Sequence, residues 1–218
     1  PKIPIALPDY AAVGGDARIR DLARTLHEVV RDDLDFSGFF AIVPEEYHRL
    51  VPAGTDRRIP HKEWLGVGAE ALLLAQASLG PSGLVFEGRL FDTSDQKMVL
   101  GKRYTGAIDL QRDLAHRLSD EIVLQYTGQQ GLARTQIAYV SQVGKAKEIF
   151  VMDYDGARPK RITGNGTINL SPAWSPYGEM IAYTSIRKDG SAEVMVIPSS
   201  GGNATGGSPQ KVTDNGTV

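Results

Sequence analysis

The first 130 residues alternate between the helical and the strand spacing of apolar side chains. Residues 16–34 have the spacing of an amphipathic helix, with Asp16 placed to cap its first turn. Residues 109–126 repeat leucine or isoleucine at every fourth position, and Gly128 follows as a stop signal. The apolar positions of the first helix lie three and four residues apart: Ile19, Leu22, Leu26, Val29 and Val30.

Short apolar runs lie before and between these two helices. Residues 60–65 have the pattern of the first turn of a short helix, with Pro60 at its start. Residues 70–77 favour a helix by composition, but a buried strand of this length would have the same pattern, so both remain open. The runs that predict strands are residues 3–7, 39–43, 84–91 and 98–105. We therefore expect residues 1–130 to form an α/β domain with a mixed sheet and two main helices.

Beyond residue 131 the helical spacing disappears and the sequence repeats itself. Ile-Ala-Tyr returns after 44 residues (181 − 137), between turns rich in Gly, Pro, Asn and Asp. Repeats of this length with several strands each are typical of β-propeller blades. The matching segments are residues 137–141 and 181–185, 148–152 and 193–197, and 160–167 and 210–217.

The repeat also predicts where the strands of each blade lie. Asp-Tyr-Asp-Gly at 153–156 suits a hairpin turn better than a calcium loop, because the other oxygen ligands of such a loop are missing. Trp174 is expected to be buried between blades. The strands expected in the first repeat are 137–141, 148–153, 160–163 and, as its fourth, 171–175; those in the second are 181–185, 193–197 and 210–213.

Several motifs resemble the TolB family. Ser-Pro-Ala-Trp-Ser-Pro-x-Gly-x-x-Ile-Ala-Tyr at 171–183 is similar to the repeat of TolB-type propellers, although related repeats occur in prolyl-oligopeptidase-like propellers. The segments 35–40, 64–72 and 134–140, with the Ile-Pro-Ile-Ala-Leu-Pro opening, resemble the amino-terminal domain of TolB and its junction with the first blade. The resemblance implies that residues 70–77 form a strand. It also implies that residues 131–218 are the first two blades or so of an incomplete propeller.

The resemblance has two departures at the ends of the chain. The family's propeller has six blades, and the chain ends at Val218, where a third Pro-Ala-Trp-Ser-Pro is due. The family's extreme amino-terminal segment, which docks onto TolA, is expected to be absent or shortened before Pro1. Because two blades cannot close a ring, we expect residues 131–218 to be unstable as an isolated monomer. Either about four more blades follow in the native polypeptide, or the fragment self-associates.

Composition and charge narrow the possible functions. The chain has 218 residues, of which 41% are hydrophobic and 23% charged, with a net charge of −2, so a globular core is expected and a nucleic-acid partner is not. The absence of cysteine excludes a disulfide, a thiolate metal site and a cysteine nucleophile. No apolar run approaches the roughly 20 residues that span a bilayer. Pro1 suggests a mature or trimmed chain whose export signal is already gone.

Candidate catalytic chemistry is sparse. None of the four histidines has a metal-ligand spacing, and the two on predicted helices, His27 and His116, are expected at the surface or its boundary. No Gly-x-Ser-x-Gly elbow and no phosphate-binding Gly-x-x-x-x-Gly-Lys loop occurs. The other two histidines are His48 and His61. We predict no catalytic, cofactor-binding or metal-ligating residue.

A group of basic residues and three Asn-x-Thr patterns are not expected to form functional sites. The basic residues Arg57, Arg58 and Lys62, with His61, are expected to be a solvated face; an acidic partner is the less favoured alternative. Three Asn-x-Thr patterns lie where blade turns call for Asn and Gly, so they are expected to be incidental and not glycosylation sites. They begin at Asn165, Asn203 and Asn215.

The resemblance implies a periplasmic protein-interaction scaffold of the Tol-Pal system, which maintains outer-membrane integrity and supports constriction in cell division. Its implied partners are a Pal-like peptidoglycan-associated lipoprotein and a TolA-like inner-membrane protein, and no cofactor is implied. Two rivals remain at this point. One is the propeller of a prolyl-oligopeptidase-like hydrolase, and the other is a TolB-like repeat protein with another binding role, such as a sensor ectodomain.

Overall fold

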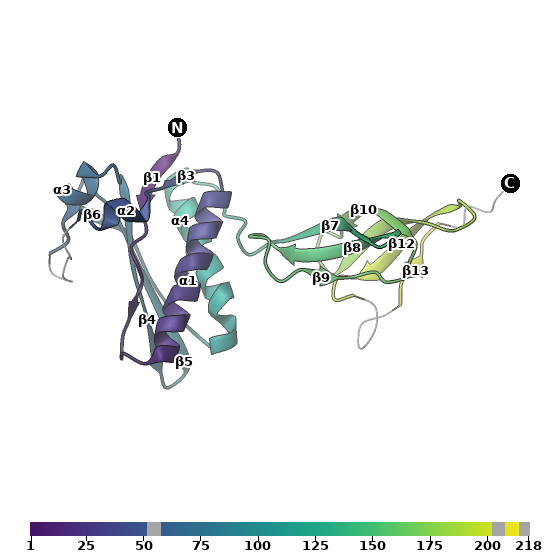
Figure 1. The fold of residues 1–218 in the computed structure, drawn as a ribbon, viewed down its shortest axis with the longest axis horizontal. Helices are drawn as coiled ribbons and strands as arrows, with labels where there is room; N and C mark the ends of the chain where they lie inside the picture. The colour runs from purple at the N-terminus through teal and green to yellow at the C-terminus, as the bar shows by residue number, and fades with distance from the viewer. Residues whose placement is uncertain (52–57, 202–207, 214–218) are drawn as a thin grey trace. The chain divides into compact units, whose positions relative to one another are not determined.

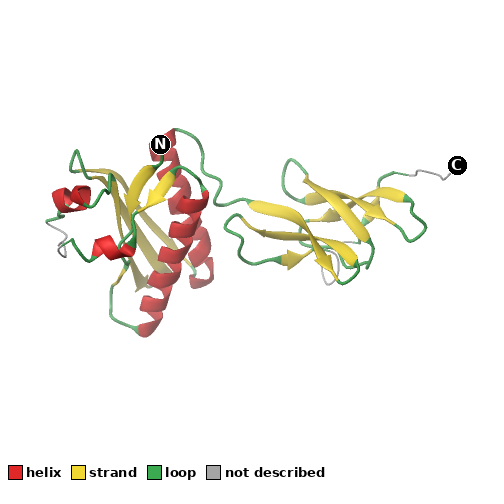
Figure 2. Cartoon of the chain, turned by 45° about the horizontal axis from the view of Figure 1, so that its top comes forward, coloured by secondary structure: helices red, strands yellow, loops and turns green. Residues whose placement is uncertain are grey.

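The computed structural model describes residues 1–51, 58–201 and 208–213. The chain divides into two compact units, Pro1–Arg134 and Thr135–Val218 (Figure 1). The first unit contains both helices and strands, whereas the described part of the second is made of strands and loops (Figure 2).

The first unit is built on a mixed sheet with the strand order β3-β1-β4-β5-β6, and the short strand β2 pairs with β4. β1 pairs in parallel with β3 and with β4. Helix α1 follows β1 and precedes β3, so it forms the crossover that parallel pairing of these two strands requires. β4, β5 and β6 form an antiparallel meander. The strands are β1 (Ile3–Ala6), β2 (Ala11–Ala12), β3 (Phe40–Ile42), β4 (Ala71–Gly80), β5 (Gly83–Asp92) and β6 (Lys97–Gly106).

Two long helices, α1 (Ala17–Phe36) and α4 (Gln111–Thr127), lie together against one face of this sheet (Figure 1). The side chain of Asp16 caps α1 by accepting a hydrogen bond from the backbone N of Arg18 at 2.9 Å. α4 follows a short 3₁₀ turn, η1 (Ile108–Leu110), and ends at Gly128, whose φ of 70° is the left-handed conformation that glycine adopts without strain. Two short helices, α2 (Glu45–His48) and α3 (His61–Gly66), complete the unit.

The main core lies between the two long helices and the sheet. Leu26 and Leu34 of α1 and Leu118 of α4 are fully buried against Phe86 of β5 and its neighbours. Gly88 of β5 is required by this packing, because a Cβ there would lie 2.7 Å from a methyl carbon of Leu118. The two helices and the sheet thus form a two-layer core within this unit.

A smaller core cluster contains Trp64 of α3. Trp64 is buried with Val43, Leu72 and Phe91, which come from the sheet and from the end of β3. Because the sheet contributes residues to both clusters, β4 is nearly continuous in apolar side chains. This explains why residues 70–77 show no strand alternation, and the strand implied by the TolB resemblance is confirmed as β4.

The second unit contains two antiparallel groups of strands. β7, β8 and β9 form the first group and β10, β11, β12 and β13 form the second. A single parallel pair, Ile168 of β10 with Lys147 of β8, joins the two groups. The strands are β7 (Gln136–Val143), β8 (Ala146–Asp153), β9 (Lys160–Arg161), β10 (Ile168–Trp174), β11 (Met180–Ile186), β12 (Ala192–Pro198) and β13 (Gln210–Lys211).

One strand assignment from the sequence is wrong. Residues 171–175 were expected to be the fourth strand of the first repeat, but β10 pairs with β11 along its length and so belongs to the second group. The second copy of the sequence repeat begins with Ile-Ala-Tyr in β11. The second hydrogen-bonded group begins one strand earlier, with β10. Within the described residues, the first group therefore has three strands and the second has four.

Candidate interaction surfaces

The histidines on the two long helices are buried, so the expectation that they lie at the surface or its boundary is wrong. His27 bonds through Nε2 to the carbonyl oxygen of Leu7 at 2.9 Å and contacts the ring of Tyr10 edge-on. His116 bonds through Nδ1 to the carboxylate of Asp33 at 2.8 Å. Both side chains fill space between a helix and its neighbours. An apolar spacing alone could not reveal this, because the partners of these ring nitrogens, Leu7 and Asp33, are distant in the sequence.

The other two histidines pack under the short helices. His48 of α2 meets the indole of Trp64 edge-on, with ring centroids 5.3 Å apart, and His61 of α3 meets Phe91 at 5.6 Å. Burial lowers the pKa of His48 below its ordinary value, since desolvation disfavours the charged ring; Glu45 and Asp9 oppose this effect. Both histidines therefore pack against the smaller core cluster, which contains Trp64 and Phe91.

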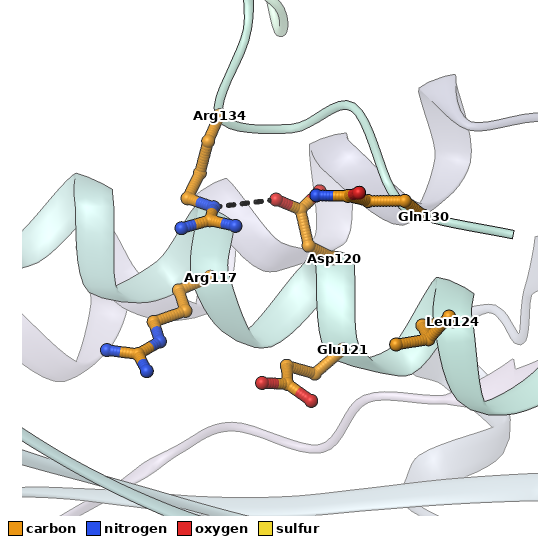
Figure 3. Close-up of a pocket in the computed structure, with 6 residues that line it drawn as sticks. All are labelled: Arg117, Asp120, Glu121, Leu124, Gln130 and Arg134. Carbon is orange, nitrogen blue, oxygen red and sulfur yellow. Dashed lines mark hydrogen bonds and ion pairs between the residues drawn. The ribbon is translucent and has the colours of Figure 1, made fainter.

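A groove of about 320 Å³ runs beside α4 (Figure 3). At its centre Asp120, which is buried, accepts hydrogen bonds from the backbone N of Ala133 at 2.8 Å and from Nε of Arg134 at 2.9 Å. Gly131 packs so closely on Asp120 that an added Cβ would lie 2.5 Å from its Cα. Asp120 therefore fixes residues 131–134 on α4, within the first unit.

The rest of this groove carries charges of both signs. The guanidinium of Arg117 lies 5.1 Å from the ring centre of Tyr104, and Glu121 forms an ion pair with Lys102 at 2.9 Å. Burial is the main cause that raises the pKa of Tyr104 to about 12. Leu124 adds an exposed apolar side chain. A mixed surface of this kind suits polar contacts with a protein partner.

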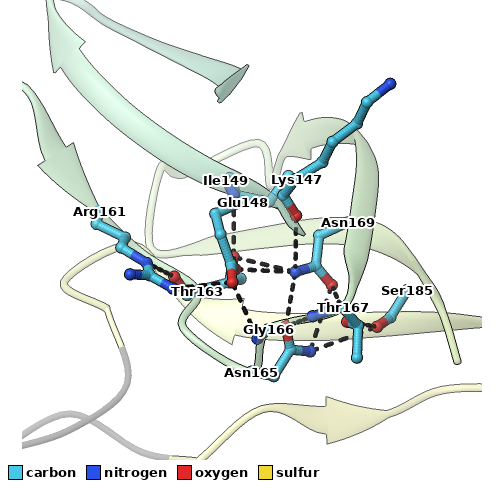
Figure 4. Close-up of polar contacts among 10 residues, drawn as sticks. All are labelled: Lys147, Glu148, Ile149, Arg161, Thr163, Asn165, Gly166, Thr167, Asn169 and Ser185. Carbon is cyan, nitrogen blue, oxygen red and sulfur yellow. Dashed lines mark hydrogen bonds and ion pairs between the residues drawn. The ribbon is translucent and has the colours of Figure 1, made fainter. Parts of the chain in front are cut away.

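A buried polar cluster lies where β10 meets β8 (Figure 4). The carboxylate of Glu148 is fully buried and accepts hydrogen bonds from Thr163 Oγ1 at 2.5 Å, from the Asn169 amide at 3.0 Å and from the backbone N of Gly166 at 3.0 Å. Arg161 supplies a cation at 2.9 Å. Four donors thus compensate the desolvation of this carboxylate, and the cluster joins the two groups of strands.

This cluster was not predicted from the sequence, although one of its members was singled out. The side-chain oxygen of Asn165 accepts from the Asn169 amide at 2.8 Å, so the first Asn-x-Thr pattern is part of the cluster. The patterns at Asn203 and Asn215 lie outside the described residues. The sequence did contain one indication of a buried carboxylate. A glutamate precedes apolar strand residues at the same place in both repeats, as Glu148 and Glu193.

The remaining candidates occupy turns and surfaces. Asp153 ends β8 and pairs with Arg158 at 2.6 Å, and its carbonyl oxygen accepts from the backbone N of Gly156, which is the predicted turn. This turn borders a second, polar groove of about 390 Å³ that also includes Lys160 and Ser200. Of the basic residues, Arg58 and Lys62 are exposed, His61 is half-buried, and Arg57 lies outside the described residues.

Trp174 is half-buried, so the prediction that it is buried between blades is wrong for this chain. Its indole packs from β10 against a core cluster that contains Ile181 and Tyr183. β10 pairs with β8 only at Ile168, and Trp174 lies at the other end of the strand. The described strands therefore cover only part of the indole.

Comparison with known proteins identifies the family. Residues 1–99 match the family described as TolB amino-terminal domain, and residues 124–205 match the family described as TolB beta propeller domain. The two matches follow one another in the order that the motifs predict. The chain belongs to the TolB family.

Two TolB relatives give the extent of the likeness. Tol-Pal system protein TolB of Desulfosudis oleivorans is 36% identical over 192 residues, which covers 87% of this chain and 44% of that protein. The protein of the same name from Syntrophus aciditrophicus is 32% identical over 209 residues, which covers 92% of this chain and 46% of that protein. The chain thus spans less than half the length of these two TolB relatives.

A solved TolB structure has the same fold. The crystal structure of TolB from Acinetobacter baumannii superimposes with a TM-score of 0.78 at 24% identity, covering 98% of this chain and 50% of that one. The α/β unit followed by propeller strands is therefore the fold of TolB. Among the described residues, no helix is both long and apolar enough to cross a membrane.

Proposed function

We propose that this chain is part of a periplasmic scaffold of the Tol-Pal system and that it acts by binding other proteins. The observation that carries the proposal is the pair of TolB matches, one for each unit, in the order found in TolB. Relatives that carry the name Tol-Pal system protein TolB support it along most of the chain. In this role the protein maintains the outer membrane and supports envelope constriction during cell division.

The proposed partners are a Pal-like lipoprotein anchored to peptidoglycan and a TolA-like inner-membrane protein. Two polar grooves offer candidate contact surfaces, one beside Asp120 and Arg117 in the first unit and one beside Lys160 and Arg158 in the second. Their mixed charges suit hydrogen-bonded contacts at a wet interface, which is common in non-obligate complexes. Both proposed partners would be met in the periplasm.

The amino-terminal match favours this scaffold over the cap of a prolyl-oligopeptidase-like hydrolase. A propeller repeat alone is compatible with either protein, but residues 1–99 match the TolB amino-terminal domain. We therefore propose that the chain has no catalytic activity of its own. Purified protein should not hydrolyse peptide or ester substrates. A turnover that survives purification and is abolished by a serine-directed inactivator would show that the hydrolase alternative is correct.

A genetic experiment tests the cellular role. Depleting the protein in its source organism should release periplasmic contents, sensitise the cells to detergent and produce chains of incompletely constricted cells. Re-expression of the protein should reverse all three changes. The control is depletion of an unrelated periplasmic protein of similar abundance. Normal detergent resistance and normal constriction after depletion would contradict the proposed role.

A further inference from the structure

The groove beside α4 contains a buried hydroxyl group without a partner. Tyr104 of β6 is 6% exposed, and its phenol oxygen is buried and forms no hydrogen bond with any residue that the structure describes. A buried polar atom without a partner costs free energy, so its presence in a folded protein needs an explanation. A ligand that accepts the proton of this hydroxyl provides one.

The hydroxyl of Tyr104 lies among the charged side chains that line the groove. The guanidinium of Arg117 lies 5.1 Å from the centre of its ring. Burial raises the pKa of Tyr104 to about 12, and the charges that also act on it all belong to the lining of the groove: Glu121, Arg117, Arg134 and Asp120. Since this pKa lies far above neutral pH, the hydroxyl keeps its proton and can donate it to an anion.

Two arginines supply further donors in the same groove (Figure 3). Arg117 is exposed, and no carboxylate in the described part of the chain lies within ion-pair distance of it. Arg134 binds Asp120 through Nε at 2.9 Å, but its side chain is 52% exposed, so its terminal nitrogens can still donate to a ligand. The groove therefore offers one hydroxyl and two guanidinium groups to an acceptor.

The local charge favours one carboxylate over a phosphate. Three cations lie near two carboxylates, which leaves a formal charge of +1 (3 − 2); they are Arg117, Arg134 and Lys102 against Asp120 and Glu121. A single carboxylate neutralises this charge, whereas a phosphate dianion would leave an excess of negative charge beside two acidic side chains. A guanidinium group also matches the planar carboxylate with two parallel hydrogen bonds.

The apolar side of the groove indicates that this carboxylate belongs to a protein segment. Leu124 of α4 lines the same groove and is 46% exposed. In an extended segment, side chains two positions apart lie on one face. An acidic side chain at the arginines can therefore be accompanied by an apolar side chain on Leu124, which a free anion would leave in water.

We propose that the groove beside α4 binds an Asp or Glu side chain of a partner protein through the hydroxyl of Tyr104 and the guanidinium groups of Arg117 and Arg134. An apolar residue two positions away in the same segment packs on Leu124. All of these residues belong to the first unit, Pro1–Arg134. The proposal rests on the proposed scaffold role, because it specifies the chemistry of a protein segment that the scaffold binds.

A capped peptide, acetyl-Ser-Leu-Ser-Glu-Ser-Leu-Ser-amide, tests this site. Its glutamate is its only charged group, and a leucine lies two residues away in either direction. The peptide is titrated into the isotope-labelled 218-residue chain, and backbone and arginine Nε signals are followed by NMR. We expect saturable shifts at Tyr104, Arg117 and Arg134, with a dissociation constant of about 1 mM or below. The same peptide with glutamine in place of glutamate should leave these signals unshifted.

Tyr104→Phe separates binding from folding. This change keeps the ring beside Arg117 but removes the hydroxyl, so binding should weaken by about tenfold, as expected for a lost hydrogen bond to a charged group. The melting temperature should stay equal or rise, since the buried hydroxyl has no partner to lose among the residues that the structure describes. A merely structural tyrosine would not show this combination.

Arg117→Gln should likewise weaken binding by about tenfold or more, because it removes a charged donor. Arg103→Gln is the matched control. Arg103 precedes Tyr104 in β6, so its side chain lies on the opposite face of the sheet, where it pairs with Glu87. The control should leave the affinity for the peptide unchanged.

Four results would overturn the proposal. They are an absence of shifts at the groove up to about 10 mM peptide, equal binding of the glutamine peptide, unchanged binding in Tyr104→Phe or Arg117→Gln, and tighter binding of inorganic phosphate than of acetate at the groove. The scaffold role is tested separately. A chain that binds a Pal-like lipoprotein but shows any of these results keeps the proposed scaffold role and loses only this site.

Discussion

His116 of α4 donates a hydrogen bond from Nδ1 to the carboxylate of Asp33 in α1, across 2.8 Å, and both side chains are buried. The bond connects two helices whose remaining contacts in the core are largely apolar. In such surroundings a hydrogen bond to a carboxylate is stronger than in water, and losing one partner costs more than the pair contributes.

Replacing His116 by leucine should therefore lower the free energy of unfolding by about 3 kcal/mol, because the carboxylate of Asp33 loses this donor while it stays buried. His116→Asn is the control, since its amide nitrogen lies close to the position of Nδ1 and can donate to Asp33. It should recover at least half of the loss. Denaturant titration followed by circular dichroism measures both variants. Equal losses in the two would show that the hydrogen bond is unimportant.

The first unit should lose stability in mild acid through His48. Burial lowers the pKa of His48 in the folded state, so folding favours the neutral ring. In the unfolded chain the pKa is about 6.5, and as the pH falls below this value the unfolded state binds the proton more readily. The stabilising contribution is thus complete above pH 6.5 and decreases toward pH 5. In His48→Gln the melting temperatures at pH 6.5 and pH 5 should lie closer together than they do in the unaltered chain. An equal dependence of the melting temperature on pH in the two proteins would contradict this cause.

Gly131 should be intolerant of any side chain. A Cβ at this position would lie 2.5 Å from the Cα of Asp120, which would displace the segment that Asp120 binds through Ala133 and Arg134. Gly131→Ala should cost about 1–3 kcal/mol, the usual range for overpacking. Gly66→Ala in α3 is the control, because nothing lies within 4 Å of its added Cβ. Similar melting temperatures for the two variants would mean that residues 131–134 are not fixed on α4.

The first unit should fold without the second. Its two long helices and six-stranded sheet enclose one continuous cluster of buried side chains, all from residues before 130. Residues 1–134, expressed alone, should therefore melt in one cooperative transition. The sequence places the boundary at residue 130, whereas the contacts of Asp120 add four residues to the unit. A shorter version that ends at residue 130 should melt at a lower temperature, and a gradual loss of signal in both would argue against an independent domain.

The two long helices of the first unit could be predicted from the sequence because each has one buried and one exposed face. The apolar spacing located α1 and α4, and Asp16 and Gly128 marked one end of each. Residues 70–77 could not be assigned by spacing, because β4 contributes buried residues to both core clusters. Two elements, β2 (Ala11–Ala12) and α2 (Glu45–His48), were not predicted because they are too short to carry a period.

The polar sites were harder to predict than the fold. Glu148 and Asn169 are 21 residues apart and come together only where β8 and β10 meet, so no local pattern indicates their contact. His116 and Asp33, 83 residues apart, meet in the same way between two helices. The internal repeat could have drawn attention to Glu148, because Glu193 occupies the same place in the second repeat.

Binding of this chain to a Pal-like lipoprotein is the most direct consequence of the proposed scaffold role. The peptidoglycan-binding domain of the lipoprotein from the same organism is titrated into the 218-residue chain by isothermal calorimetry. We expect one-to-one binding with a dissociation constant in the micromolar range or tighter, and no heat from an unrelated acidic domain of equal size. An absence of measurable binding up to millimolar concentration, with a chain that still melts cooperatively, would contradict the proposal that this chain is a Tol-Pal scaffold.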